Sequence, residues 1–189
     1  MNEKKIEFLY QSINDTQATI RATDVKIGFL FVVIFLPLTS VEGLSKAVAK
    51  LWDSPYHLGF VSVITALLWL CSVYVLFKSL SPITDIQKHM IGIIPADTFY
   101  MGGMPIIGKK DFFNINDVRA SQDVQTYLSA LPQDEQKLLE ALASEKMKVS
   151  LIRNVKNLRV NVCTNLTLGW LTLGMFLSTI YYFSFGIQA

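Results

Sequence analysis

The chain has 189 residues, of which 51% are hydrophobic and only 17% are charged, whereas about 25% are charged in soluble domains. These values and a mean hydropathy of +0.38 exclude a disordered or collagen-like chain and indicate a membrane protein. Because the net charge is only +2, any affinity for polyanions depends on where the basic side chains lie. Cys71 and Cys163 both lie in apolar runs, which argues against a disulfide framework and a cysteine metal site, and no cofactor is expected.

Three long stretches lack charged side chains, namely residues 27–41, 54–77 and 160–189. A membrane-spanning helix needs about 20 mostly apolar residues, which the second and third stretches provide, while the first is shorter and contains Pro37. A soluble helical bundle is the alternative, but Leu58–Phe77 is apolar on all sides, unlike an amphipathic core helix. We therefore predict an all-α membrane protein with three transmembrane helices, near residues 27–44, 57–77 and 162–186.

Lysine and arginine are concentrated before the first predicted span and between the second and third spans. The positive-inside rule then places the N-terminus in the cytoplasm and the C-terminus outside, which makes this a multi-pass protein. The chain divides accordingly into a cytoplasmic amphipathic helix at 1–26, two transmembrane helices at 27–77 with an outer loop at 45–56, a cytoplasmic ligand-sensing region at 78–159, and a third transmembrane helix at 160–189.

The cytoplasmic part is predicted to be mostly helical, with long helices continuous with spans one and three. Isoleucine recurs every seven residues in Lys5–Lys26, which is typical of a helix with one packing seam. Pro132 and the acidic pair Asp134 and Glu135 predict a second helix start. No glycine or proline follows before Arg159, so this helix runs on into the third span. Residues 117–130 predict a short helix, while 91–94 and 106–107 fit either short strands or packed loop.

Catalytic motifs are missing from the sequence. The two histidines, His57 and His89, are predicted on opposite sides of the membrane and have no metal-ligand spacing to a cysteine or carboxylate. No nucleophile elbow, phosphate-binding glycine loop or zinc-helix motif occurs. We therefore do not expect an enzyme.

Basic side chains of the predicted cytoplasmic part are candidates for binding an anionic ligand. Near the membrane, however, anionic headgroups favour lysine and arginine at about 1 kcal/mol each without any ligand, and this explanation suffices for the residues closest to the span, Lys156 and Arg159. An oligomer would repeat the basic face around its symmetry axis. The candidate ligand-binding residues are Lys146, Lys148, Arg153, Lys156, Arg119, Lys109 and Lys110.

The third predicted span carries polar side chains at a spacing of 4, 7 and 7, which places them on one side of the helix. Polar side chains in lipid are costly unless they face protein or water. They either hydrogen-bond neighbouring helices, which is the commoner role, or line a water-filled path. The candidate pore-lining residues are Asn161, Asn165, Thr172 and Thr179.

This layout and several local motifs resemble the transmembrane effectors of bacterial Pycsar antiphage systems. The matching motifs are Asp24-Val25-Lys26 at the entry to the first span, Ser79-Leu80-Ser81-Pro82 after the second, Phe112-Phe113-Asn114-Ile115 followed by the Tyr127-Leu128 helix, and the basic helix at 146–159. The Met101–Pro105 loop and the Lys109-Lys110 pair depart from the family pattern, so the family's ligand does not carry over automatically.

The resemblance implies a nucleotide-controlled effector that impairs the inner membrane during phage infection, a form of abortive infection. The implied ligand is a cyclic mononucleotide made by a companion nucleotide-synthesising enzyme. A single-stranded oligonucleotide, as in the related Hailong type of defence, is the other candidate, because basic residues spread over several turns can meet several phosphates.

Two functions from different classes follow from these observations. The first is a homo-oligomeric ion channel or pore in the bacterial inner membrane, controlled by the bound nucleotide. The second is a non-conducting membrane adaptor that recruits a protein partner through the seam of Ile6, Ile13 and Ile20.

Overall fold

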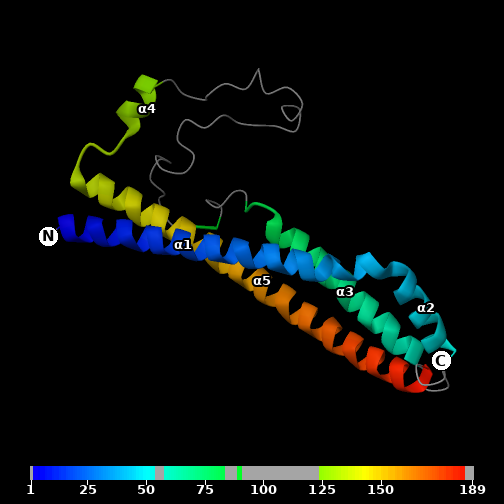
Figure 1. The fold of residues 1–189 in the computed structure, drawn as a ribbon. Coiled ribbons are helices and arrows are strands. Elements are labelled where there is room, and N and C mark those ends of the chain that lie inside the picture. The colour runs from blue at the N-terminus through cyan, green and yellow to red at the C-terminus, as the bar shows by residue number, and fades with distance from the viewer. Residues whose placement is uncertain (1, 54–57, 84–88, 91–123, 186–189) are drawn as a thin grey trace. The chain divides into compact units, whose positions relative to one another are not determined.

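A computed structural model describes residues 2–53, 58–83, 89–90 and 124–185. Three stretches, Asn2–Trp52, Leu58–Leu80 and Glu135–Ser184, are long and apolar enough to cross a membrane, which confirms the predicted all-α membrane protein with three spans. The elements in this part of the chain are α1 (Asn2–Phe35), the 3-10 helix η1 (Leu36–Ser40), α2 (Val41–Trp52), α3 (Leu58–Leu80), α4 (Val124–Ala130) and α5 (Glu135–Phe185) (Figure 1).

The chain folds as two compact units, which are described separately. Unit 1 comprises Met1–Ala18 and Thr84–Ile152, and unit 2 comprises Thr19–Ile83 and Arg153–Ala189. The long helices α1 and α5 each contribute one part to unit 1 and the other part to unit 2.

The core of unit 2 joins α1, α3 and α5. Ile27 and Ile34, seven residues apart on α1, are 2% and 0% exposed and pack with Leu76 of α3 and with Val160 and Cys163 of α5. Heptad spacing places such side chains on one seam. In unit 2 the predicted isoleucine spacing is therefore continued beyond Ile27 to Ile34, and both side chains are covered by the chain's own helices.

Small side chains allow α3 to approach α5 closely. Ser72 and Ser79 are fully buried, and each hydroxyl donates to a carbonyl of its own helix, at 2.7 Å to Trp69 and 2.8 Å to Val75. The Cys163 thiol of α5 donates to the Ser72 carbonyl oxygen at 3.6 Å. Small residues at the contact and satisfied hydroxyls are the usual means of packing helices in a membrane.

The first span is not one uninterrupted helix, although the prediction treated residues 27–44 as one segment. α1 ends at Phe35 and gives way to η1 and then α2, because Pro37 has no N–H to continue the ladder and its ring conflicts with the preceding turn. The Trp69 Nε1–H of α3 donates to the Ile34 carbonyl oxygen at 2.8 Å. This bond satisfies one of the carbonyls that the end of α1 leaves free.

Gly59 is required for the close approach of α2 and α3. A Cβ at this position would lie 2.5 Å from Trp52 Cε3 and 3.1 Å from its Cα. We predict that Gly59→Ala lowers the free energy of unfolding by about 1–3 kcal/mol, as for other overpacked contacts, measured by thermal unfolding in detergent. Gly28→Ala is the matched control, since a Cβ there meets nothing within 4 Å. This variant is expected to gain about 0.5–1 kcal/mol of stability, because alanine favours a helix more than glycine does. Equal shifts in the two variants would show that the contact with Trp52 has no energetic weight.

Unit 1 joins the beginning of α1 to the beginning of α5. The Asp134 side chain accepts from the Lys137 backbone N–H at 2.7 Å and caps α5, as the proline and acidic residues predicted. From there α5 runs unbroken to Phe185, which confirms a helix continuous with the third span. Leu142 and Val149 of α5 and Ile13 of α1 are buried in this unit.

Some predictions fall outside the described residues. These are the short strands or packed loop at 91–94 and 106–107 and the beginning of the helix predicted at 117–130, of which α4 forms the described part.

Candidate functional site

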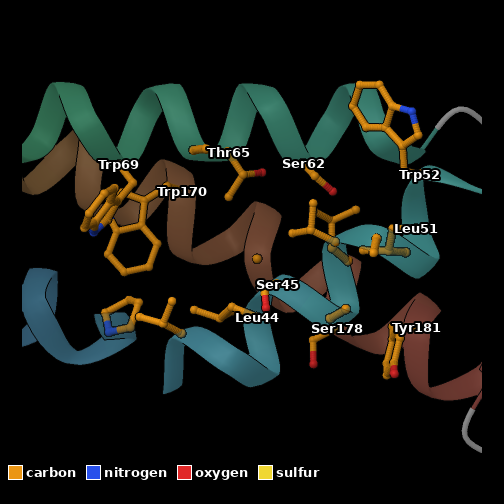
Figure 2. A pocket seen from close by; sticks show the side chains of 18 of the residues that line it. Leu44, Ser45, Leu51, Trp52, Ser62, Thr65, Trp69, Trp170, Ser178 and Tyr181 are labelled. Atoms are coloured by element: carbon orange, nitrogen blue, oxygen red, sulfur yellow. The ribbon is translucent and has the colours of Figure 1, made fainter. Parts of the chain in front are cut away.

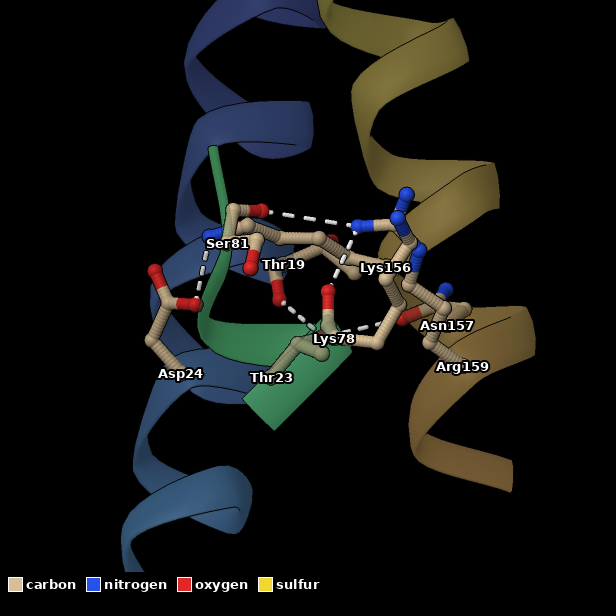
Figure 3. Close-up of polar contacts among 8 residues, drawn as sticks. All are labelled: Thr19, Thr23, Asp24, Lys78, Ser81, Lys156, Asn157 and Arg159. Atoms are coloured by element: carbon tan, nitrogen blue, oxygen red, sulfur yellow. Dashed lines mark hydrogen bonds and ion pairs between the residues drawn. The ribbon is translucent and has the colours of Figure 1, made fainter. Parts of the chain in front are cut away.

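Polar side chains of α1, α3 and α5 meet where α3 ends in unit 2, and we name this group the three-helix cluster. Figure 3 shows hydrogen bonds and ion pairs that join α5 to α3 and α5 to α1. The members are Thr19, Thr23, Asp24, Lys78, Ser81, Lys156, Asn157 and Arg159.

Arg159 of α5 caps the end of α3. Its Nη1 donates to the Lys78 carbonyl oxygen at 2.8 Å and to the Ser81 carbonyl oxygen at 3.4 Å. α3 ends here because Pro82 disfavours a helical conformation for Ser81, which leaves its last carbonyls without helical partners. A guanidinium at this end also interacts favourably with the negative end of the helix dipole.

Two contacts connect α5 to α1 within the three-helix cluster. Lys156 Nζ lies 2.5 Å from Asp24 Oδ1, and the Lys156 side chain is only 21% exposed. The Thr23 hydroxyl donates to Asn157 Oδ1 at 2.9 Å. The charge of Lys156, a predicted ligand-binding residue, is therefore paired within the chain.

The four residues predicted to line a pore lie together on the exposed side of α5. We call Asn161, Asn165, Thr172 and Thr179 the polar stripe; all four are exposed. On the other side of the helix, Cys163, Thr167 and Trp170 are buried in unit 2. The polar stripe thus faces away from α1 and α3, so it does not serve to join the helices of one chain.

The threonine hydroxyls of the polar stripe donate to their own helix. Thr172 Oγ1 lies 3.0 Å from the Gly169 carbonyl oxygen, and Thr179 Oγ1 lies 2.8 Å from that of Met175. These bonds satisfy the hydroxyl donors and leave the oxygen lone pairs available on the exposed side. The stripe can therefore accept hydrogen bonds from water or from another chain.

The sequence analysis missed Asn154, which begins the same exposed side. Asn154 is exposed and lies seven residues before Asn161, so the heptad spacing was a signal for it. Its Oδ1 accepts from Arg153 Nε at 3.2 Å and from Nη2 at 3.1 Å. Arg153 is thereby held beside the beginning of the polar stripe.

In unit 1, Lys146 and Lys148 have different environments. Lys146 Nζ of α5 donates to the Ser12 carbonyl oxygen of α1 at 2.9 Å and to the Thr16 hydroxyl, so this predicted ligand-binding residue holds the two helices together. Lys148 is 5% exposed, and burial lowers the pKa of its ammonium group below the ordinary 10.5.

One turn before Lys148, Glu145 is buried, with 7% of its surface exposed. Burial raises the pKa of its carboxyl group above the ordinary 4.5. Within the part of the chain that the structure describes, Glu145 Oε2 has no hydrogen-bond partner. Glu145 therefore offers a carboxylate oxygen without a described partner one turn before the buried Lys148, which suits a ligand with an N–H donor.

We predict that Glu145→Gln raises the free energy of unfolding at pH 7 by about 1 kcal/mol, because it removes the burial of a charged carboxylate. Since the folded-state pKa is raised, wild-type protein recovers this stability as the pH falls, and the two proteins become equal below the ordinary pKa of 4.5. Unfolding curves from pH 4 to 8 measure the difference, with the exposed Glu140→Gln as control. A difference that does not change with pH would contradict the assignment.

The remaining predicted ligand-binding residues, Lys109, Lys110 and Arg119, lie outside the described residues. Of the other four, Lys146 and Lys156 are engaged within the chain, Lys148 is buried, and Arg153 lies beside the polar stripe.

A family model for the Pycsar effector protein domain matches residues 8–183, a range that includes the three-helix cluster and the polar stripe. No curated protein matches the chain, and no solved structure matches it.

Proposed function

Because the chain belongs to the Pycsar effector protein family and is an effector of antiphage defence, we propose that it forms a homo-oligomeric pore in the bacterial inner membrane. The three apolar stretches make it a membrane protein, and its family is tied to cyclic nucleotide signalling from a companion enzyme. In this proposal, a nucleotide bound by the cytoplasmic region controls whether the pore conducts.

The polar stripe is the observation that carries the proposal. Asn161, Asn165, Thr172 and Thr179 are exposed on a helix that crosses the membrane. Polar side chains in that position are unfavourable against lipid and mark water-filled paths or contacts with other chains. Copies of α5 arranged around an axis bring the stripes together, and a single chain with three spans is too small to enclose a path.

The ligand contact that we propose is Lys148 with Glu145 in unit 1. Glu145 Oε2 accepts an N–H from a nucleobase, and the ammonium group of Lys148 adds positive charge near the anionic ligand. α5 is continuous from Glu135 to Phe185. A ligand that binds better to one rotation of this helix therefore also favours one orientation of the polar stripe. Lys109, Lys110 and Arg119 remain further candidates for the same ligand.

Charge and aromatic side chains support the proposed orientation. Lys78, Lys156 and Arg159 gather at the three-helix cluster, which is the cytoplasmic end under the positive-inside rule. At the other end, Lys50 Nζ lies 5.7 Å from the centre of the Tyr181 ring, and Trp52 of α2 is exposed. Aromatic side chains are typical of the membrane interface.

Ion flux from liposomes that contain the purified protein tests the proposal. We expect flux to change on addition of cyclic CMP or cyclic UMP, with cyclic AMP as the comparison nucleotide. Lys148→Met removes the charge but keeps the apolar stem, and we expect it to abolish the nucleotide response. Liposomes that stay tight under all conditions, with folded protein present, would refute the pore.

The adaptor function has less support. It needs Ile6, Ile13 and Ile20 available to a partner, yet Ile13 is only 7% exposed and the other two are half-buried. The seam is thus largely occupied by the chain itself, and liposomes without conductance remain the result that would favour an adaptor.

A further inference from the structure

Unit 2 contains an open-sided pocket of about 740 Å³ between α2, α3 and α5. Figure 2 shows side chains from all three helices around the space, with Trp69 and Trp170 at one end and Leu51, Trp52 and Tyr181 toward the other. The volume is within the range of about 300–1,000 Å³ that is usual for ligand pockets.

The break in the first span creates this space. After α1 ends at Phe35, η1 and α2 continue with Pro37, Leu44 and Val48 lining one side of the pocket. On the α5 side lies Gly174, and a Cβ added there would meet nothing within 4 Å. The pocket therefore arises from two features of the sequence, namely the helix break at Pro37 and the lack of a side chain at Gly174.

The walls are suited to an apolar ligand. All three tryptophans of the chain line the pocket. Among the hydroxyls that line it, those of Ser45, Ser62 and Thr65 donate to the Glu42, Leu58 and Val61 carbonyl oxygens of their own helices at 2.9, 3.2 and 2.9 Å. These three hydroxyls therefore need no polar partner from what fills the pocket, whereas Trp170 Nε1 has no hydrogen-bond partner among the described residues.

The length of the pocket matches one leaflet of the membrane. Trp170 and Tyr181 lie eleven positions apart on α5, a rise of about 16 Å at about 1.5 Å per residue. This is about half of the hydrocarbon core of about 30 Å, and one leaflet is the length of one acyl chain. Near the Tyr181 end, Lys50 lies over the Tyr181 ring and provides a cation at the level of a lipid headgroup.

We propose that this pocket binds one acyl chain of a phospholipid, whose phosphate lies near Lys50. Among apolar molecules, phospholipid surrounds the spans at the highest concentration, and mass action favours it over any scarcer ligand. A large apolar space left empty forfeits contacts along its whole lining. The proposal depends on insertion of the chain in a membrane and not on conduction or on nucleotide binding.

Two variants that fill the pocket test the proposal. Gly174→Leu places a side chain into the open space from α5, and Ala66→Leu does so from α3. Gly28→Leu is the matched control, because Gly28 is exposed on α1, outside the pocket, with nothing within 4 Å of its Cβ. Thermal unfolding verifies that all three proteins are folded.

Native mass spectrometry measures the phospholipid bound to each protein. Quenching of tryptophan emission is measured in vesicles of phosphatidylglycerol and phosphatidylethanolamine whose acyl chains are brominated. We expect wild type and Gly28→Leu to retain one phospholipid per chain and both filling variants to lose it, together with part of the quenching. Trp170 reports directly, since it is 7% exposed and shielded from the surrounding lipid.

Equal retention and equal quenching in all four proteins would overturn the proposal. So would quenching that is weak at high protein density and increases when protein is diluted in lipid, because a second copy of the chain would then occupy the pocket.

Discussion

We expect Thr172→Leu to abolish the proposed ion flux through liposomes that contain this protein, and Thr172→Ser to retain it. Each copy loses one hydroxyl from the polar stripe, and each hydrogen bond is worth about 1 kcal/mol. If several copies surround one axis, the losses of the copies add. Each 1.4 kcal/mol changes an equilibrium constant about tenfold. A ring of leucines also closes a narrow path by excluding water.

The control for this prediction is a substitution on the lipid side of another span. Leu67 is 56% exposed and lies on α3, whereas the polar stripe lies on α5, so Leu67→Ala serves as the control. We expect flux near that of wild type for this variant. If Thr172→Leu conducts as well as wild type while it is folded and inserted, the stripe does not line the path.

Arg159→Ala lowers the free energy of unfolding by about 1.5–3 kcal/mol, the value of hydrogen bonds made by a charged group. The variant leaves the Lys78 and Ser81 carbonyl oxygens at the end of α3 without the guanidinium that now bonds them. It also removes these two bonds between α5 and the end of α3 in the three-helix cluster. Thermal unfolding in detergent measures the change.

Arg153→Ala is the matched control for Arg159→Ala. Its guanidinium bonds the neighbouring Asn154 on the same helix, so its loss releases no contact between helices. We expect a change within about 0.5 kcal/mol, as for surface substitutions. An equal loss of stability in the two variants would show that the cap on α3 has no special weight.

The helices of this protein are readable from sequence because their signals are local. The absence of glycine and proline from 135 to 159 and the acidic residues after Pro132 predicted α5, and the isoleucine heptads predicted the seam of α1. Pro37 is also a local signal for the end of α1 at Phe35. The apolar run around Pro37 nevertheless predicts a single span. Apolar composition indicates that a segment lies in lipid. The continuity of a helix depends instead on a backbone N–H at each position, which proline lacks.

The candidate site was only partly readable, since its contacts join distant parts of the chain. The polar stripe could be predicted because its residues follow helical spacing. The same spacing, continued seven residues before Asn161, reaches Asn154. Nothing local in the sequence shows that Lys146 is bound to Ser12 or that Lys156 is bound to Asp24. Their partners lie more than 130 residues away, so only the packing of α5 on α1 reveals which basic residues are engaged.

Access of water to the polar stripe tests the central claim most directly. In a Cys71→Ser background, which removes the exposed native thiol and keeps the buried Cys163, Thr172→Cys is treated with a charged, membrane-impermeant thiosulfonate during flux recording. We predict rapid modification and a fall in flux at Thr172→Cys and no effect at Leu67→Cys on the lipid side of α3. Unchanged flux and an unmodified thiol at position 172, in protein that conducts, would contradict a path lined by α5.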